Sequence, residues 1–285
     1  MAEKDQACSS ASSCSRESCE GCPSKSGGMA SFRVEQNAES NIRHVIGVVS
    51  GKGGVGKSLV TASLANALAK SGARVGILDA DITGPSIPKM YGLTGPAEAL
   101  SETQILPETA SNGVKVMSLN LIMTDPEQAV IWRGPVIAGV VKQFWTDVVW
   151  GELDYLLVDM PPGTGDVPLT VFQSLPVDGI FIVTSPQDLV RMIVTKALNM
   201  ARAMDIPVLG VIENYSYLTC PDCGRKIEVF GKSRIEEIAG ETGIELAGQI
   251  PIVPEYSGMA DAGKFAEVEN EYLQAAMDCL RRAAR

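Results

Sequence analysis

Short runs of β-branched and other apolar residues recur along the chain and predict buried strands. The first run, Ile42–Val49, is nearly continuous in apolar side chains, which is typical of a strand covered on both faces of a parallel sheet. Later runs of the same kind occupy Arg74–Leu78, Val114–Leu119, Leu153–Val158, Gly179–Thr184 and Val208–Ile212.

Helix-like stretches separate these runs and predict the layers that cover the sheet. They occupy Lys57–Ala69, Ala138–Val149, Leu189–Met204 and Ser233–Gly240. The alternation of strands and helices predicts an α/β fold with a doubly wound, mostly parallel sheet. In such sheets ligands bind beyond the carboxyl ends of the strands. The last segment, Glu267–Arg285, is predicted to be a closing helix, because its acidic residues come first and its arginines last, as the helix dipole favours.

The first forty residues differ from the rest of the chain. They are rich in Ser, Gly, Glu and Cys and hold few large apolar residues. Such a composition cannot bury a core. The chain is therefore predicted to have a flexible, Cys-rich tail over residues 1–40 and a single globular domain over residues 41–285.

Composition narrows the class of protein. A hydrophobic share of 45% and a charged share of 20% allow a large core and exclude a wholly disordered chain. The formal net charge of −10 argues against a nucleic-acid partner. No apolar run reaches the length of about 18 residues that a transmembrane helix needs, and the start of the chain lacks the apolar centre of a secretory signal. We therefore expect a cytoplasmic protein with no membrane partner.

Cysteine usage points to metal or redox chemistry. Stable disulfides are rare in the cytoplasm, so clustered cysteines there need another explanation. The chain has seven cysteines: Cys8, Cys14, Cys19 and Cys22 in the tail, then Cys220 and Cys223, then Cys279. Cys279 lies among apolar residues of the predicted last helix and is interpreted as a buried, inert thiol.

A glycine-rich phosphate-binding loop directly follows the first strand. The segment GKGGVGKS fits the P-loop pattern G-x-x-x-x-G-K-S between a predicted strand and a predicted helix. Its glycines let backbone N–H groups turn towards phosphate oxygens, Lys57 is expected to reach the β- and γ-phosphates, and the Ser58 hydroxyl to meet Mg²⁺. The predicted nucleotide-binding residues are Gly51, Lys52, Gly53, Gly54, Val55, Gly56, Lys57 and Ser58.

Carboxylates stand at two other predicted strand ends. Asp79 and Asp81 follow the second strand, and Asp159 follows Leu153–Val158. A carboxylate beside a P-loop can hold Mg²⁺ through its waters or orient an attacking water. We expect Asp81 to position the water and Asp159 to lie in the second shell of the metal and sense the γ-phosphate. Asp79 is equally compatible with a purely structural role.

The pair Cys220 and Cys223 is a candidate metal site. Two thiolates at this spacing, in a short turn before a glycine, can face one metal centre. A four-coordinate site needs two more ligands, which either a second subunit or the tail pair Cys19 and Cys22 can supply. An iron–sulfur cluster, a structural zinc ion and a redox dithiol are the three interpretations of the pair.

The second lysine of the P-loop, Lys52, resembles a distinct class of nucleotide-binding proteins. In GKGGVGKS it is similar to the deviant P-loop of MinD, ParA and the nitrogenase iron protein. The resemblance implies that Lys52 reaches the nucleotide of the other subunit in a face-to-face dimer, so that Lys52, Lys57 and Asp81 carry catalysis. It also implies that the nucleotide is ATP and that Asn214, with the stretch Ile250–Pro254, contacts the adenine.

Taken together, several motifs resemble the Mrp/ApbC family of iron–sulfur cluster carrier P-loop ATPases. They are GKGGVGKS, DADITGPS, WRGP, WGELDY, DMPPGTGD, SPQ and ENYSYLTCPDCG. The resemblance covers about residues 41–262. It implies a homodimer that holds a [4Fe–4S] cluster between the Cys220 and Cys223 pairs, binds and hydrolyses ATP, and delivers the cluster to apo-proteins.

The tail resembles the cytosolic scaffold branch of that family in the phrase CEGCP. That branch holds a second cluster on four N-terminal cysteines, one of which follows the C-x-x-C-P phrase. This chain has Gly28 in that region and offers Cys14 before the pair instead. A second cluster, a zinc ion or loose thiols therefore remain open for Cys8, Cys14, Cys19 and Cys22.

Two other functions fit part of the sequence. A MinD- or ParA-type spatial-regulator ATPase explains the P-loop and Lys52 but leaves CPDCG and the Cys-rich tail without a role. A zinc-stabilised nucleotide switch explains the cysteines but predicts zinc in place of iron. A cluster-carrying ATPase accounts for both sets of motifs.

Overall fold

The computed structural model describes residues 33–81, 84, 86–123, 134–163, 165–186 and 190–284. A compact unit spans Val34–Arg285 and starts before the expected domain boundary near Asn41. Its first residues are attached by polar contacts: Trp145 Nε1 donates to the Val34 carbonyl at 2.9 Å, and Asn37 Nδ2 donates to the Thr146 carbonyl at 2.9 Å. Hydrogen bonds thus hold a stretch whose sequence is poor in apolar residues.

The described residues include an eight-stranded sheet in the order β10-β7-β6-β1-β5-β2-β4-β3. Every pairing is parallel except that of β3 with β4. The strands are β1 (Asn41–Ser50), β2 (Val75–Asp79), β3 (Glu108–Thr109), β4 (Lys115–Met117), β5 (Glu152–Asp159), β6 (Gly179–Thr184), β7 (Val208–Glu213) and β10 (Leu246–Gln249). The six predicted strands are all present in this sheet. The long apolar runs form its centre, because a strand covered on both faces has no polar side.

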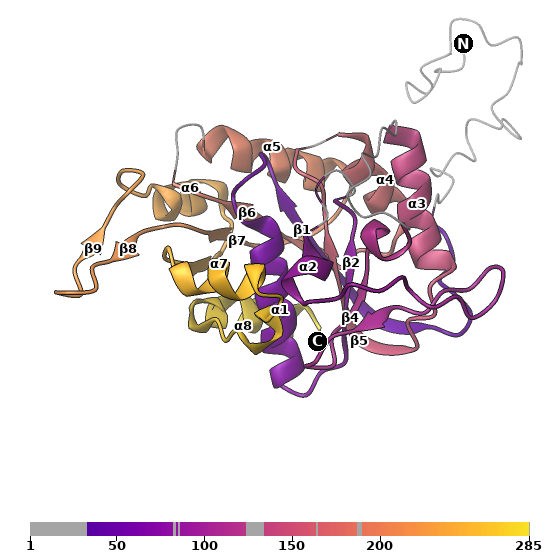
Figure 1. The fold of residues 1–285 in the computed structure, drawn as a ribbon. Coiled ribbons are helices and arrows are strands. Elements are labelled where there is room, and N and C mark those ends of the chain that lie inside the picture. Colours follow the sequence, from indigo (N-terminus) through magenta and orange to yellow (C-terminus); the bar gives the residue numbers. More distant parts are fainter. Residues whose placement is uncertain are drawn as a thin grey trace, which may run out of the picture. The chain divides into compact units, whose positions relative to one another are not determined.

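Helices cover both faces of the sheet, each over its own apolar core (Figure 1). On one face pack α1 (Lys57–Lys70), α2 (Ile87–Met90), α7 (Pro254–Asp261) and α8 (Gln274–Ala283). On the other face pack α3 (Gly134–Thr146), α4 (Asp166–Ser174), α5 (Val190–Ala203) and α6 (Ile235–Thr242). The doubly wound fold is thereby confirmed. Single 3₁₀ turns cover Leu119–Leu121, Phe265–Glu267 and Glu271–Leu273.

The prediction for the last segment is wrong in part. The final helix, α8, begins at Gln274, and its first turn holds no acidic residue. Two 3₁₀ turns precede it, and Asn270 Oδ1 accepts a hydrogen bond from the Tyr272 backbone N–H. The acidic residues lie in these turns (Glu267 and Glu271) or between them (Glu269), and only Arg281 and Arg282 in the last turn of α8 act on the helix dipole as expected.

A small antiparallel hairpin stands apart from the main sheet. Its strands are β8 (Leu218–Thr219) and β9 (Lys226–Ile227), and it projects beyond the sheet and its helices (Figure 1). Residues 221–232 are all exposed to solvent. In the described part of the chain, no helix combines the length and the apolarity that a membrane crossing requires.

Candidate functional site

The P-loop connects the buried end of β1 to the start of α1. Gly54 and Gly56 both adopt a φ of 77°, which lets the chain turn tightly at these two positions. Gly56 is the N-cap residue of α1 and has no side chain to accept a hydrogen bond from the first turn of the helix. The first N–H groups of α1 therefore remain available to an anion, and the helix dipole adds to their attraction.

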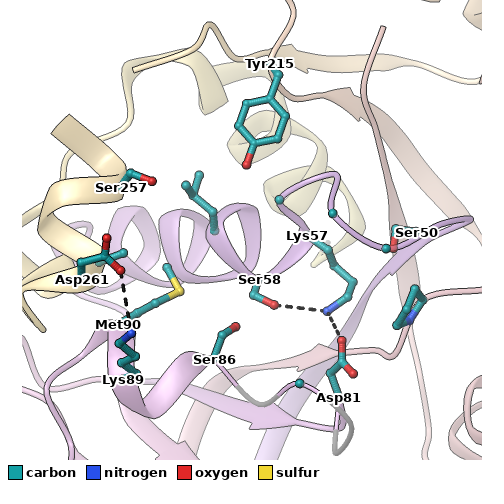
Figure 2. Close-up of a pocket in the computed structure, with 17 residues that line it drawn as sticks. Ser50, Lys57, Ser58, Asp81, Ser86, Lys89, Met90, Tyr215, Ser257 and Asp261 are labelled. Atoms are coloured by element: carbon teal, nitrogen blue, oxygen red, sulfur yellow. Dashed lines mark hydrogen bonds and ion pairs between the residues drawn. The ribbon is translucent and has the colours of Figure 1, made fainter. Parts of the chain in front are cut away.

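A cavity of 440 Å³ opens directly over this loop. Figure 2 shows Lys57, Ser58 and Asp81 on one side of it, Lys89, Met90 and Asp261 on the opposite side, and Tyr215 above. The P-loop residues Gly53, Gly54, Gly56, Lys57 and Ser58 all contribute to its lining. A crevice at the end of β1, between β5 and β6, is where a doubly wound sheet binds its ligand.

Lys57 and Asp159 form a buried ion pair at the floor of the site. Lys57 Nζ lies 2.8 Å from Asp159 Oδ2 and 3.6 Å from Asp81 Oδ2. The side chain of Lys57 is 6% exposed and that of Asp159 is fully buried. Burial alone lowers the pKa of Lys57, but the charge and hydrogen bond of Asp159, with weaker contributions from Asp81 and Asp79, outweigh it and raise that pKa. The ammonium is therefore fixed in its charged form.

Two hydroxyls of α1 complete the environment of Asp159. Ser58 Oγ donates to Asp159 Oδ2 at 2.6 Å, and Thr61 Oγ1 donates to Asp159 Oδ1 at 2.7 Å. Lys57, Ser58 and Thr61 reach one carboxylate because positions i and i+4 share a helix face. Thr61 was absent from the sequence-based site, although its spacing from Lys57 was visible.

A hydroxyl beside a buried carboxylate is a donor set suited to Mg²⁺, which prefers oxygen ligands and retains several waters. Ser58 and Asp159 supply these oxygens at the end of β5, next to the phosphate loop. The residues present therefore fit the metal that the P-loop pattern implies.

Asp79 is a second buried carboxylate, at the end of β2. Its Oδ1 accepts the Asp81 backbone N–H at 3.1 Å, and its Oδ2 accepts the Ser118 hydroxyl at 3.2 Å. Burial and the charge of Asp159 raise its pKa well above the ordinary value, although Lys57 opposes this shift. Asp79 thus braces the backbone of Asp81, while Asp81 itself faces the cavity.

The loop after β7 contacts the backbone of the P-loop. Asn214 is buried, and its Nδ2 donates to the Val55 carbonyl at 3.0 Å. A Cβ added to Gly56 would lie 2.1 Å from that same nitrogen. Asn214 therefore supports the backbone of the phosphate loop, and its contact with adenine stays a prediction. Its neighbour Tyr215, which sequence reasoning missed, lines the cavity.

Lys52 lies on the P-loop and is half-buried, and Gly51 approaches α5 so closely that a Cβ there would lie 2.1 Å from Ile193 Cγ2. The loop thus has little freedom at Gly51. Reach of Lys52 into a second subunit stays a prediction.

The cysteine pair lies at the tip of the β8–β9 hairpin. The Cys220 N–H donates to the Arg225 carbonyl, and the Gly224 N–H donates to the Cys220 carbonyl, both at 2.9 Å. Gly224 closes the turn with a φ of 70°. The backbone N–H groups of Cys223 and Asp222, followed by the Cys223 side chain, lower the pKa of Cys220. A thiolate held by backbone N–H groups in a tight turn is the form that binds metal.

The hairpin offers two thiols as candidate ligands, which is fewer than a four-coordinate metal site needs. Within the described residues, no group of three or more His, Cys, Asp or Glu side chains is placed to hold a metal ion. Cys8, Cys14, Cys19 and Cys22 lie outside the described residues. Cys279 is buried in α8, as expected, and burial raises its pKa to about 11.

Comparison with known proteins also indicates a P-loop nucleotide-binding protein. A model of the ParA family, described as NUBPL iron-transfer P-loop NTPase, matches residues 41–284. An iron-sulfur cluster carrier protein of Methanocaldococcus jannaschii is 46% identical over 242 residues, which cover 82% of this chain and 83% of the relative. The carrier of the same name from Clostridium perfringens is 47% identical over 234 residues, covering 80% and 82% of the two chains.

Solved structures agree as well. A nucleotide-binding protein of Archaeoglobus fulgidus, solved in complex with ADP, has a TM-score of 0.73 and 43% identity, covering 82% of this chain and 91% of that one. MinD of Aquifex aeolicus has a TM-score of 0.57 at 24% identity, covering 84% and 95% of the two chains, and shares the fold.

Proposed function

This chain belongs to the iron–sulfur cluster carrier family of P-loop NTPases, and from that premise we propose that it is an ATPase that carries a [4Fe–4S] cluster as cargo. Two copies of the chain hold the cluster between their Cys220 and Cys223 pairs. ATP binds and is hydrolysed in the cavity over the P-loop. The cluster is passed on to apo-proteins that lack one.

The observation that carries this proposal is the geometry of the Cys220–Cys223 turn. Its two thiols lie in an exposed hairpin, and backbone N–H groups favour the thiolate of Cys220. Within the described residues the turn has no further metal-ligating neighbours. A second subunit supplies the two missing thiolates, and the resulting four-cysteine set is the usual ligation of a [4Fe–4S] cluster.

Nucleotide chemistry in the cavity follows from the buried charges. Lys57 exchanges Asp159 for the β- and γ-phosphates, so that phosphate oxygens replace one carboxylate partner of the ammonium. Ser58 and Asp159 would hold Mg²⁺, which would supply positive charge against the phosphates when bound. Asp81 faces the cavity 3.6 Å from Lys57 Nζ and orients the attacking water. Lys52 reaches across the dimer to the nucleotide of the partner.

Anaerobic reconstitution with iron and sulfide tests the cargo. The full chain and Cys220→Ser/Cys223→Ser are compared by visible spectrum and by iron and zinc content, and Cys279→Ser serves as the control for loss of a cysteine outside the hairpin. We expect about four iron atoms per dimer that depend on the hairpin pair, and about twelve if each tail also holds a cluster.

The outcomes separate the candidate functions. Loss of iron in the double variant and its retention in Cys279→Ser support the carrier. Zinc in place of iron identifies a zinc-stabilised nucleotide switch. A protein that binds neither metal but hydrolyses ATP contradicts the carrier and favours a MinD-type regulator.

A further inference from the structure

A buried carboxylate that the ATPase chemistry does not use lies at the end of β7. Glu213 is 1% exposed. Its Oε2 accepts the Ser216 hydroxyl at 2.6 Å and the Gln249 amide at 3.3 Å, and its Oε1 accepts the Ser233 hydroxyl at 2.9 Å. Among the described residues, no lysine or arginine forms an ion pair with it.

Burial of this carboxyl group costs free energy of folding. A carboxyl group removed from water needs compensation, and here the partners are two hydroxyls and an amide, all uncharged. Apolar groups of the same shape can replace both partners of a buried hydrogen bond with little loss of stability. Stability alone therefore does not account for Glu213, and the groups that it joins suggest its role.

On one side Glu213 adjoins the nucleotide cavity. The next residue, Asn214, donates to the Val55 carbonyl of the P-loop, and Tyr215 lines the cavity. Tyr215 has a φ of 58°, a left-handed backbone conformation that is rare and strained outside glycine. One hydrogen bond, from Asn214 to the Val55 carbonyl, and one peptide unit thus connect the P-loop to Glu213.

On the other side Glu213 joins both legs of the cysteine hairpin. Ser216 precedes β8, and Ser233 follows β9, so the two hydroxyls mark the two ends of the segment that holds Cys220 and Cys223. One carboxyl group therefore ties both legs of the hairpin to the residue beside the P-loop contact.

We propose that Glu213 is a positioning residue that couples occupancy of the nucleotide cavity to the placement of the Cys220–Cys223 hairpin. The proposal rests on the proposed function. When phosphates draw Lys57 away from Asp159, the P-loop backbone shifts, and Val55 moves Asn214 with it. Glu213 passes that displacement to Ser216 and Ser233 together, so the hairpin moves as a unit.

Amide hydrogen exchange in the full-length protein tests the coupling without a cluster. Exchange over residues 218–231 is compared with and without a non-hydrolysable ATP analogue and Mg²⁺, in wild type, Glu213→Met and Glu213→Gln. We expect nucleotide to change hairpin exchange about 5-fold or more in wild type, a typical size for coupling between two sites. Met has no acceptor for the serines, so the change should fall below about 2-fold, and Gln, which keeps one carbonyl oxygen, should be intermediate.

Controls separate coupling from damage to the fold. Thr242→Ala removes a hydroxyl that bonds within α6 and not to Glu213, and it should respond to nucleotide as wild type does. Nucleotide affinity of the Glu213 variants should stay within about 3-fold of wild type. If Glu213→Met does not fold, Ser216→Ala and Ser233→Ala serve in its place. Each removes one of the two hydrogen bonds between Glu213 and the hairpin, and each should reduce the effect of nucleotide on hairpin exchange.

A second readout separates this inference from the carrier function. Iron release from the reconstituted protein to bathophenanthroline disulfonate is followed with and without Mg-ATP. If ATP changes the rate of iron release from wild type but not from Glu213→Met, both proposals are supported. A full response of hairpin exchange and iron release in a folded Glu213→Met overturns the role of Glu213 alone. Hairpin exchange that responds through Glu213 in a protein that takes up no iron contradicts the carrier and leaves the coupling intact.

Discussion

The nucleotide cavity and the cysteine hairpin are built in opposite ways. The cavity is set on the carboxyl ends of β1, β2 and β5, and its charged groups Lys57 and Asp159 are buried beneath it. The hairpin consists of two short strands with no cover, and three large apolar side chains, Ile227, Val229 and Phe230, are exposed along it.

The difference shows how each region obtains its chemistry. The cavity depends on the core, because only a rigid, poorly solvated site can hold an ammonium and several carboxylates at fixed distances. The hairpin is held by its own backbone hydrogen bonds, and its two thiols lie outside the apolar cores. Changes in the cavity should therefore alter stability and nucleotide chemistry together, whereas replacement of the hairpin cysteines should leave the stability of the core unchanged.

Replacement of Lys57 tests the cavity most severely. Lys57→Met removes the ammonium that lies 2.8 Å from Asp159 and 3.6 Å from Asp81. We expect ATP hydrolysis to fall by about 10²–10³-fold, the usual loss for a group that stabilises transition-state charge. The free energy of unfolding of the nucleotide-free protein should fall by about 3–5 kcal/mol, because a buried carboxylate loses its partner. Phosphate release and urea unfolding measure the two effects.

Lys70→Met is the matched control for this change. Lys70 lies in the last turn of the same helix, and its side chain is 65% exposed. The control should change neither hydrolysis nor stability measurably. Hydrolysis in Lys57→Met at the rate of the control would show that the ion pair at the cavity floor is not part of the ATPase.

Thiol reactivity compares the hairpin with the core directly. Burial raises the pKa of Cys279 to about 11, so at pH 8 only about one thiol in a thousand is ionised there. Backbone N–H groups lower the pKa of Cys220, which is also accessible. Iodoacetamide should therefore alkylate Cys220 at least about 100-fold faster than Cys279 at pH 8, as measured by peptide mass spectrometry. In urea the two rates should converge, and equal rates in the folded protein would contradict the contrast.

Contiguous motifs made the cavity predictable from the sequence. The residues of the P-loop motif, Gly51–Ser58, are contiguous in the sequence. Asp81 and Asp159 each follow an apolar run that clearly predicts a strand. The parallel sheet then brings these strand ends to one edge without further information. The contacts of Asn214 and Glu213 were not predictable, because they depend on how the loop after β7 meets the P-loop and β10. The start of α8 was missed because local hydrogen bonding at Asn270 overrides the charge pattern.

Two glycines of the P-loop distinguish backbone strain from close packing in the cavity. Gly54 and Gly56 share a φ of 77°, so alanine strains the backbone equally at both, by about 1 kcal/mol. A Cβ on Gly54 meets nothing within 4 Å, whereas one on Gly56 would lie 2.1 Å from Asn214 Nδ2. Gly56→Ala should therefore lose a further 1–3 kcal/mol or so of stability and weaken nucleotide binding more than Gly54→Ala does. Urea unfolding and nucleotide titration of both variants test this, and equal losses would mean that Asn214 yields freely.

Asp79 provides the smallest and most specific test of the cavity. Its pKa is raised by burial and by Asp159, so the native state binds a proton more tightly than the unfolded state does. Below the ordinary pKa of 3.8 both states are protonated. Between 3.8 and the raised pKa the native state loses stability as pH rises.

Asp79→Asn keeps an acceptor for the Asp81 N–H and a donor to Ser118 but has no proton to lose. The variant should gain little stability relative to wild type near pH 4 and progressively more towards pH 7, as the native wild type loses the proton of Asp79. Urea midpoints from pH 4 to 7 measure the gain against Asp278→Asn, the same substitution at a side chain that is 49% exposed. A gain that does not depend on pH would show that Asn simply packs better, and a loss at pH 7 would show that the charge of Asp79 stabilises the native cavity.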